Sequence, residues 1–161
     1  MSEGTTVVGA DQVKTRLDAL DALYAELPAL ACQRKCAESC GPIAMSLLEY
    51  QRVLRWSGRT VLTVKTGTNL SCPLLRRGLC SVHVVRPMIC HLWGLTPKMA
   101  CPFGCVPSFW LTEEETKRYL DRAVALSEGR GIRVRIEDEH ERAQHAVDVQ
   151  ARGELQTWLG T

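Results

Sequence analysis

Eight cysteines are the residues of this 161-residue sequence with the clearest chemical potential. They form an early group of three, spaced C-x3-C-x3-C, and a later group of five, spaced C-P-x6-C-x9-C-x10-C-P-x2-C. Clustered thiols indicate metal ligation, and thiolate sulfur selects zinc, copper(I) or iron–sulfur clusters over magnesium or calcium. The expected metal ligands are therefore Cys32, Cys36, Cys40, Cys72, Cys80, Cys90, Cys101 and Cys105.

The number of metal sites stays open at this level. Eight thiolates would complete two four-cysteine sites, and one four-cysteine cluster with spare thiols fits the same count. On one continuous helix Cys32 and Cys36 would share a face, but Cys40 would lie roughly 12 Å from Cys32 along the axis. Either the helix breaks before Cys40, which Gly41 and Pro42 favour, or Cys40 serves a second site. A cubane cluster is wider than a single ion and C-x2-C pairs are absent, so the spacing favours a 4Fe–4S cluster, with zinc as the alternative.

The N-terminal sequence bears on the compartment. Residues 1–12 have no basic region followed by an apolar run, so we expect no secretory signal. No stretch approaches 18 apolar residues, the length of about one membrane span, so we expect no membrane association. A cytoplasmic, reducing location follows, in which disulfides are the lesser alternative to metal ligation.

Several elements are predicted to position the cysteines. Apolar residues recur at three- and four-residue steps from Asp11 to Leu27, which predicts a helix, and Pro28 marks its end or a kink. Ser-Leu-Leu-Glu at 46–49 is a capping box that opens a short helix through Trp56. Thr-Glu-Glu-Glu at 112–115 is a second one, opening a helix to about residue 128.

The segments between these helices read as strands and loops. Alternating apolar and charged residues over 132–137 predict a half-exposed strand, and 61–64 predict another short one. Residues 72–105 contain five of the eight cysteines and four of the seven prolines, so they cannot form one long helix. Short strands, turns and loops are expected there, with a turn at 66–71 before them.

Together these elements predict a mainly helical α+β fold with an irregular, metal-stapled, cysteine-rich core that holds short strands between N- and C-terminal helices. The length fits one domain, residues 1–161. Its parts would be an N-terminal helix at 10–30, a cysteine-cluster core at 31–110, and a C-terminal helical extension with a short strand at 111–161. The last helix of that extension is expected over 139–159.

The segment CPLLRRGLCSVHVVRPMICHLWG at 72–94 resembles a family signature. Its Cys-Pro-x-Leu stretch and its Arg-Pro-x-x-Cys element are similar to those of the YkgJ-type cysteine-cluster proteins, described as zinc- or iron-chelating domains, and the likeness covers about residues 32–105. The resemblance implies metal binding and no single activity. By this resemblance Arg86 and Pro87 correspond to the family's Arg-Pro. The family's N-terminal ligands correspond to Cys32, Cys36 and Cys40, its central ligands to Cys72, Cys80 and Cys90, and its late ligand to Cys101 or Cys105.

The sequence departs from the family pattern at three positions. Gly41 stands where the family has the second of two adjacent cysteines, His83 where tyrosine is common, and His91 where arginine is common. Imidazole is a good zinc ligand, but eight thiols make histidine ligands unnecessary, so we expect His83 and His91 to hydrogen-bond or pack beside the cofactor. Arg86 is expected beside it as well, because positive charge offsets the charge of thiolates.

Composition bounds the function without naming it. The chain is 45% apolar and 24% charged, as in ordinary globular proteins, and a net charge of +2 does not by itself indicate nucleic-acid binding. We expect a metal-binding protein in which the site has a structural or redox role.

Two alternatives belong to other classes of protein. One is a metal- or cluster-dependent modifying enzyme, although no glycine-rich nucleotide loop, Ser-His-Asp arrangement or H-E-x-x-H motif completes an active site. The other is a metal-stabilised module that binds a protein partner or nucleic acid. Its candidate surface is a basic–aromatic group, Arg52, Arg55, Trp56 and Arg59, which reads otherwise as a solvated helix face with Trp56 packed.

Overall fold

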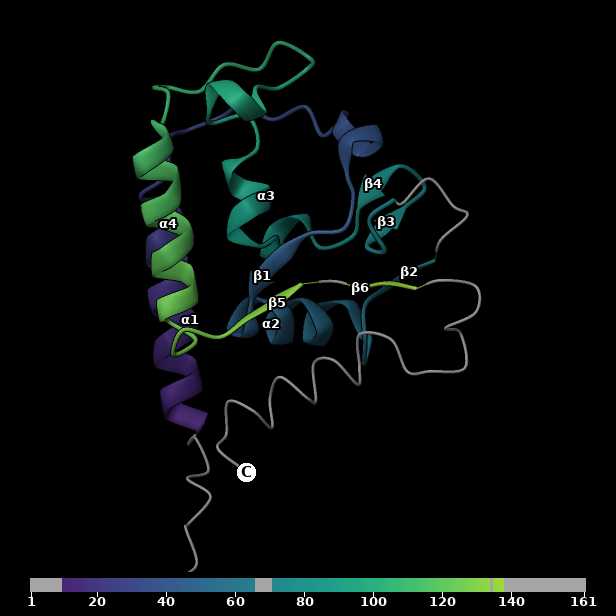
Figure 1. The fold of residues 1–161 in the computed structure, drawn as a ribbon, viewed down its shortest axis with the longest axis vertical. Coiled ribbons are helices and arrows are strands. Elements are labelled where there is room, and N and C mark those ends of the chain that lie inside the picture. Colours follow the sequence, from purple (N-terminus) through teal and green to yellow (C-terminus); the bar gives the residue numbers. More distant parts are fainter. Residues whose placement is uncertain (1–9, 66–70, 134, 138–161) are drawn as a thin grey trace, which may run out of the picture.

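The computed structural model describes residues 10–65, 71–133 and 135–137. Helices dominate this part of the chain, and six strands of two or three residues accompany them (Figure 1). The mainly helical α+β prediction is confirmed at this level, while the single-domain boundaries stay a prediction. In chain order the elements are α1 (Ala10–Ala25), the 3₁₀ turn η1 (Cys36–Ser39), β1 (Ala44–Ser46), α2 (Leu47–Ser57), β2 (Thr63–Lys65), β3 (Leu75–Arg76), β4 (Leu79–Cys80), η2 (His83–Val85), α3 (Met88–Leu92), η3 (Pro97–Met99), α4 (Glu113–Ala125), β5 (Gly131–Arg133) and β6 (Arg135–Glu137).

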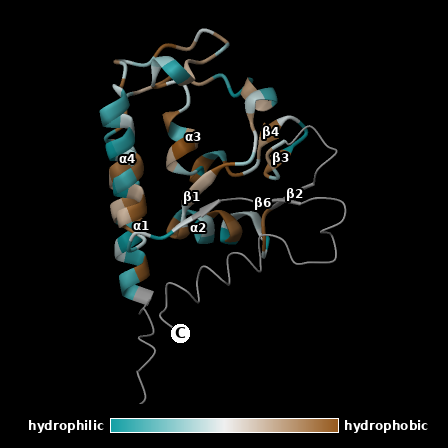
Figure 2. Cartoon of the chain, viewed as in Figure 1, coloured by the Kyte–Doolittle hydropathy of each residue, from teal (hydrophilic) through white to brown (hydrophobic). Residues whose placement is uncertain are grey.

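Two apolar clusters form the core. One joins α1, α3 and α4 and contains the fully buried Leu20 and Leu92. The other joins α2 to the β3–β4 region and contains Val53 and Leu62. Figure 2 shows hydrophobic residues along α3, which contributes to the first cluster. Two of the cysteines, Cys72 and Cys80, pack against the second cluster.

The helix ends agree well with local sequence signals. The Ser46 hydroxyl accepts from the Glu49 backbone N–H at 3.3 Å while the Glu49 carboxylate accepts from the Ser46 N–H at 2.8 Å, which confirms the first capping box. The second one, at Thr112, is also present. The predicted extent of the first helix to residue 30 is wrong, because α1 ends at Ala25. Pro28 disfavours helical backbone in the residue before it, and one irregular turn leads into it.

Three two-stranded sheets hold the segments together. β1 pairs antiparallel with β5, β2 pairs parallel with β6, and β3 pairs antiparallel with β4. β5 and β6 thus pair with the segments on the two sides of α2. The predicted strand at 132–137 is confirmed as β5 and β6. The predicted turn at 66–71 and helix at 139–159 fall wholly or largely outside the described residues.

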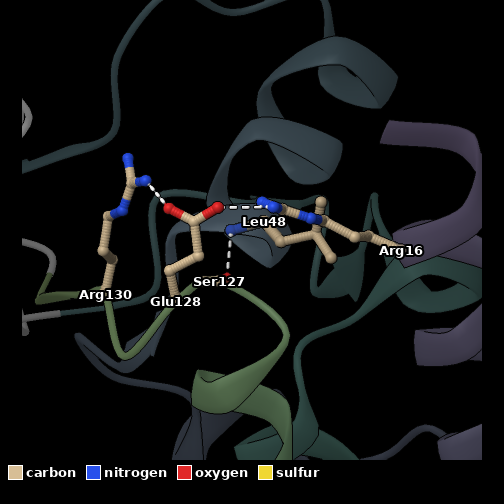
Figure 3. Close-up of polar contacts among 5 residues, drawn as sticks. All are labelled: Arg16, Leu48, Ser127, Glu128 and Arg130. Carbon is tan, nitrogen blue, oxygen red and sulfur yellow. Dashed lines mark hydrogen bonds and ion pairs between the residues drawn. The ribbon is translucent and has the colours of Figure 1, made fainter. Parts of the chain in front are cut away.

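The turn after α4 is hydrogen-bonded to the start of α2 (Figure 3). The buried Ser127 hydroxyl accepts from the Leu48 backbone N–H at 2.9 Å. Next to it, Glu128 forms ion pairs with Arg16 of α1 and with Arg130. Because Leu48 lies in the first turn of α2, where backbone N–H groups lack helical partners, Ser127 satisfies a donor that would otherwise be buried without one.

Gly94 has a left-handed backbone, and a side chain there would crowd the end of the Leu30 side chain. Its φ is +88°, and a Cβ atom there would lie 2.7 Å from Leu30 Cδ2. We expect Gly94→Ala to lower the free energy of unfolding by about 2–4 kcal/mol, through left-handed strain and overpacking. Gly58→Ala is the matched control: φ is +66° there with nothing near the added methyl, so a loss of about 1–2 kcal/mol is expected. Urea unfolding of both variants measures the difference, and equal losses would contradict the close approach to Leu30.

Candidate metal centre

The first three cysteines do not lie on one helix. Cys32 is in an irregular segment, Arg34 has a left-handed backbone (φ 58°), and the short η1 turn begins only at Cys36. Cys40 follows η1 with extended backbone. No continuous helix spans Cys32 to Cys40: the chain bends between Cys32 and Cys36, and η1 ends before Cys40.

Cys40 lies with the central cysteines. The Cys72 backbone N–H donates to the Cys40 carbonyl at 2.9 Å, so the two segments touch directly. Cys80 ends the β3–β4 hairpin, where it pairs with Leu75, and the Leu75 N–H donates to the Cys72 carbonyl at 3.1 Å. These bonds hold three cysteines from two distant parts of the sequence in one place.

Cys90 of α3 completes this set. Burial raises the pKa of the Cys90 thiol, and the neighbouring thiols of Cys72, Cys80 and Cys40 raise it further. Burial likewise raises the pKa of Cys40 to about 11, with contributions from Cys36, Cys72 and Cys80. Since such charge effects require proximity, the four thiols are mutual neighbours. We call Cys40, Cys72, Cys80 and Cys90 the inner group.

The other four cysteines are linked in sequence by neighbouring pairs, and one of them, Cys36, also adjoins the inner group, because the Cys40 thiol donates to the Cys36 carbonyl at 3.6 Å. Burial raises the pKa of the Cys36 thiol, and Cys32 and Cys101 add to the rise. Burial also acts to raise the pKa of Cys101, but backbone N–H groups of Phe103 and Cys105 and the Cys105 thiol outweigh it, so that pKa is lowered. We call Cys32, Cys36, Cys101 and Cys105 the outer group.

Three of the sulfurs accept a backbone N–H from the residue two positions further on. The Arg34 N–H donates to Cys32 Sγ at 3.4 Å, and the N–H groups of Leu74 and Phe103 act in the same way on Cys72 and Cys101. Donors of this kind stabilise the thiolate form, which is the form that binds metals. At Cys101 these donors lower the pKa of the thiol, whereas at Cys72 burial outweighs the Leu74 N–H and the pKa is raised.

Arg86 joins the two predicted histidines. Its guanidinium donates to His83 Nε2 at 2.7 Å and to His91 Nδ1 at 3.4 Å. Burial, with the charge of Arg86, lowers the pKa of His83 to about 4 and that of His91 to about 3, so both rings are neutral. The Arg86 charge also opposes the rise in the pKa of Cys36 and of Cys90. Arg86 thus lies near both cysteine groups, and the histidines are its hydrogen-bond acceptors.

The sequence did not reveal a further role of Glu49. Only 2% of this residue is exposed, and beyond its capping box it accepts from the Met88 N–H at 2.6 Å and from the Tyr24 hydroxyl at 2.7 Å. The Tyr24 ring stacks on His91, with ring centroids 4.3 Å apart. Glu49 therefore ties α1 and α2 to the start of α3, the helix that carries Cys90. The capping box gave no sign of these bonds.

The eight thiols are chemically suited to a thiophilic metal, but the distances between their sulfurs are too long for ligation of one ion. None of the eight cysteines, all within the described residues, forms a disulfide. In the same residues, no three His, Cys, Asp or Glu side chains stand close enough together to hold a metal ion. Ligation would require the sulfurs of a group to draw together.

Comparisons of the chain with protein-family models, curated proteins and solved structures find no match. The resemblance to the YkgJ-type proteins accordingly stays a prediction from the sequence motifs. Across the described part of the chain, no helix combines the length and the apolar character needed to cross a membrane.

The basic–aromatic group lies along α2 and just after its end. Trp56 is 56% exposed, so the expectation that it packs is wrong. The Arg52 guanidinium forms an ion pair with Asp21 of α1 at 2.7 Å, which leaves it less available to a partner. This surface offers no stronger case for a partner than the sequence did.

Proposed function

We propose that this chain binds a metal cofactor through its inner cysteine group and uses it to hold the cysteine-rich loops in place. The observation that supports the proposal is the meeting of Cys40, Cys72, Cys80 and Cys90, which come from three separate segments of the sequence. Burial and mutual proximity raise the pKa of these thiols, and the Arg86 charge offsets only part of that rise at Cys90. A soft metal would supply further positive charge, because it binds thiolates directly.

An iron–sulfur cluster, of the 4Fe–4S type, is the favoured cofactor, with zinc as the alternative. The inner sulfurs are neighbours without standing at the distances that one ion requires. A cluster is wider than an ion, so the four side chains need to move less to reach it. When bound, the cofactor would supply cross-links between segments and, as a cluster, one-electron redox chemistry.

The chain's own residues prepare this site. The backbone bond between Cys72 and Cys40 sets two ligand segments side by side, and the Leu74 N–H opposes part of the rise that burial causes in the pKa of Cys72. Arg86 supplies a fixed positive charge, because guanidinium remains protonated at every relevant pH. Its two neutral histidine acceptors hold it in position.

Anaerobic purification with elemental analysis and a visible spectrum tests the proposal. Iron and sulfide with broad absorbance near about 400 nm would identify a cluster, and a colourless zinc-loaded protein would identify the alternative ion. We expect Cys90→Ser to lose the inner-group metal, because it removes the ligand that α3 provides. Ser39→Ala, an exposed change between two cysteines, is the control and should keep the metal. A wild-type protein without stoichiometric metal would refute the proposal.

A further inference from the structure

Positive charge is concentrated in the middle of the sequence. Residues 29–112 contain ten of the 20 lysines and arginines but only two of the 18 aspartates and glutamates, Glu38 and Glu49, so this stretch has a net charge of +8. The remainder of the chain has ten basic and 16 acidic residues and a net charge of −6. Because Glu49 is buried and hydrogen-bonded in the core, Glu38 is the one exposed carboxylate of the basic stretch.

Four of these basic residues have exposed side chains. They are Arg34 and Lys35, just before η1, and Arg76 and Arg77, at the end of the β3–β4 hairpin. The ion pairs among the described residues involve none of the four. Their charges are therefore available to a negatively charged partner.

The two pairs lie at the same side of the molecule. The backbone bond from Cys72 to Cys40 joins the segment that carries the first pair to the segment that carries the second. Burial, with the charges of Arg86 and Arg34, lowers the pKa of His83, which lies three residues after β4, so Arg34 is near the hairpin segment. Figure 1 shows the dark-blue turn η1 beside β3 and β4, on the side away from α1 and α4. We call the two pairs together the basic face.

Two arginines of the basic face have a backbone conformation that arginine rarely adopts. Arg77 and Gly78 form the two-residue turn of the hairpin, with φ of 51° and 77°. This is the pattern of a type I′ turn, whose first position favours Asn, Asp or Gly. Arg34 is also left-handed, with φ of 58°. Since this conformation costs stability in a residue with a Cβ, the chain keeps arginine at two places where other residues would fold better.

The shape of the hairpin indicates which polyanion fits. Guanidinium groups bind phosphate through two parallel hydrogen bonds, which favours a phosphodiester backbone. A two-stranded ribbon fits the major groove of B-form DNA, about 12 Å wide, whereas the corresponding groove of duplex RNA is too narrow. Leu79, beside the turn, is 56% exposed, and Val84 of η2 is 68% exposed. Both are aliphatic, so they offer no ring on which the bases of a single strand could stack.

We propose that the basic face binds double-stranded DNA, with the tip of the β3–β4 hairpin in the major groove and Arg34 and Lys35 on the adjacent phosphates. Contacts to phosphates carry no sequence information, so little sequence preference is expected. The proposal uses no cysteine ligand. Its failure would therefore leave the proposed metal site standing, and a protein without metal would not by itself overturn it.

Fluorescence anisotropy with a labelled DNA duplex of about 20 base pairs tests the proposal on protein purified anaerobically. Four phosphate contacts predict a slope of about −3.6 for log affinity against log salt, or roughly 100-fold weaker binding between about 50 and 200 mM salt. Arg76→Gln/Arg77→Asn should reduce the size of the slope by about 2 and the affinity at least about tenfold. Arg55→Gln/Arg118→Gln removes equal charge from exposed positions on α2 and α4 and should change the affinity less than about threefold. Equal losses in the two double variants would overturn the assignment to this face.

The single variant Arg77→Asn separates binding from folding. Asparagine suits the first position of a type I′ turn better than arginine does, so the urea midpoint should stay the same or rise. The affinity for the duplex should nevertheless fall at least about threefold, because one phosphate contact is lost. An unchanged affinity, or a lower urea midpoint, would overturn the claim that Arg77 serves binding rather than the turn.

Chemical modification of the unaltered protein makes the test independent of the variants. Phenylglyoxal labels exposed arginines, and peptide mass spectrometry locates the labels with and without duplex DNA. We expect DNA to protect Arg34, Arg76 and Arg77 but not Arg55 or Arg118. Equal protection of all five, or of none, would overturn the proposal. Tighter binding to single-stranded DNA, to duplex RNA or to vesicles of anionic lipid than to duplex DNA would overturn it as well.

Discussion

Glu49→Ala should lower the free energy of unfolding by about 3–5 kcal/mol, which is large for one substitution outside the cysteines. The change leaves the buried N–H groups of Ser46 and Met88 and the Tyr24 hydroxyl without their acceptor. Each such loss costs about 1–3 kcal/mol, reduced where the structure relaxes. Urea unfolding followed by circular dichroism measures the loss.

Milder substitutions separate the contributions to this network. Glu49→Gln keeps the shape but turns an NH2 group toward a backbone donor, so an intermediate loss is expected. Tyr24→Phe removes one donor and should cost about 1 kcal/mol. Burial, together with the Glu49 charge, raises the pKa of Tyr24, so its hydroxyl stays protonated and donates throughout the neutral range. Glu114→Gln, an exposed change on α4, should stay within about 0.5 kcal/mol, and a comparable loss there would contradict the special role of Glu49.

Removal of the metal is expected to have the largest effect of all. Metal ligation can supply on the order of 10 kcal/mol of folding free energy in a small domain, comparable to the whole stability of such a domain. Anaerobic treatment with a strong chelator should therefore open residues 32–105, with loss of near-ultraviolet dichroism and rapid proteolysis between the cysteines.

Restoring the metal provides the control for this experiment. Structure that returns on adding zinc, or iron with sulfide, but not magnesium, would show that thiophilic ligation is responsible. A metal-free chain with unchanged dichroism and protease resistance would contradict the structural role. The helices α1 and α4 provide a separate readout of folding. The Arg122 guanidinium of α4 binds the Glu26 carboxylate just after α1, and this contact does not involve the cysteines.

Local sequence signals predicted local structure well in this chain. The capping boxes at Ser46 and Thr112 placed two helix starts, because their hydrogen bonds join residues only three apart. The short α3 was not predicted, since five residues after Pro87 show no clear period. The alternation at 132–137 predicted a strand but could not name its partners, because pairing with β1 and β2 depends on contacts about seventy to ninety residues away.

The candidate site was likewise predictable only in part from the sequence. Residue types and spacing identified the cysteines as ligand candidates, because that inference concerns chemistry rather than position. The meeting of Cys40 with Cys72 depends on a backbone bond between segments 32 residues apart, which leaves no mark in the sequence. The two histidines were expected beside the cofactor, but their neutral state follows from burial and from Arg86. Such effects arise only once the chain is folded.

The pairing of residues 131–137 with both sides of α2 has a consequence for biosynthesis. All eight cysteines precede α4, whereas β5 and β6 follow it. Since N-terminal parts of a chain leave the ribosome first, the full set of thiols emerges before the strands that complete two of the sheets. A metal delivered to the nascent chain thus meets ligand loops that are not yet held by their last strands.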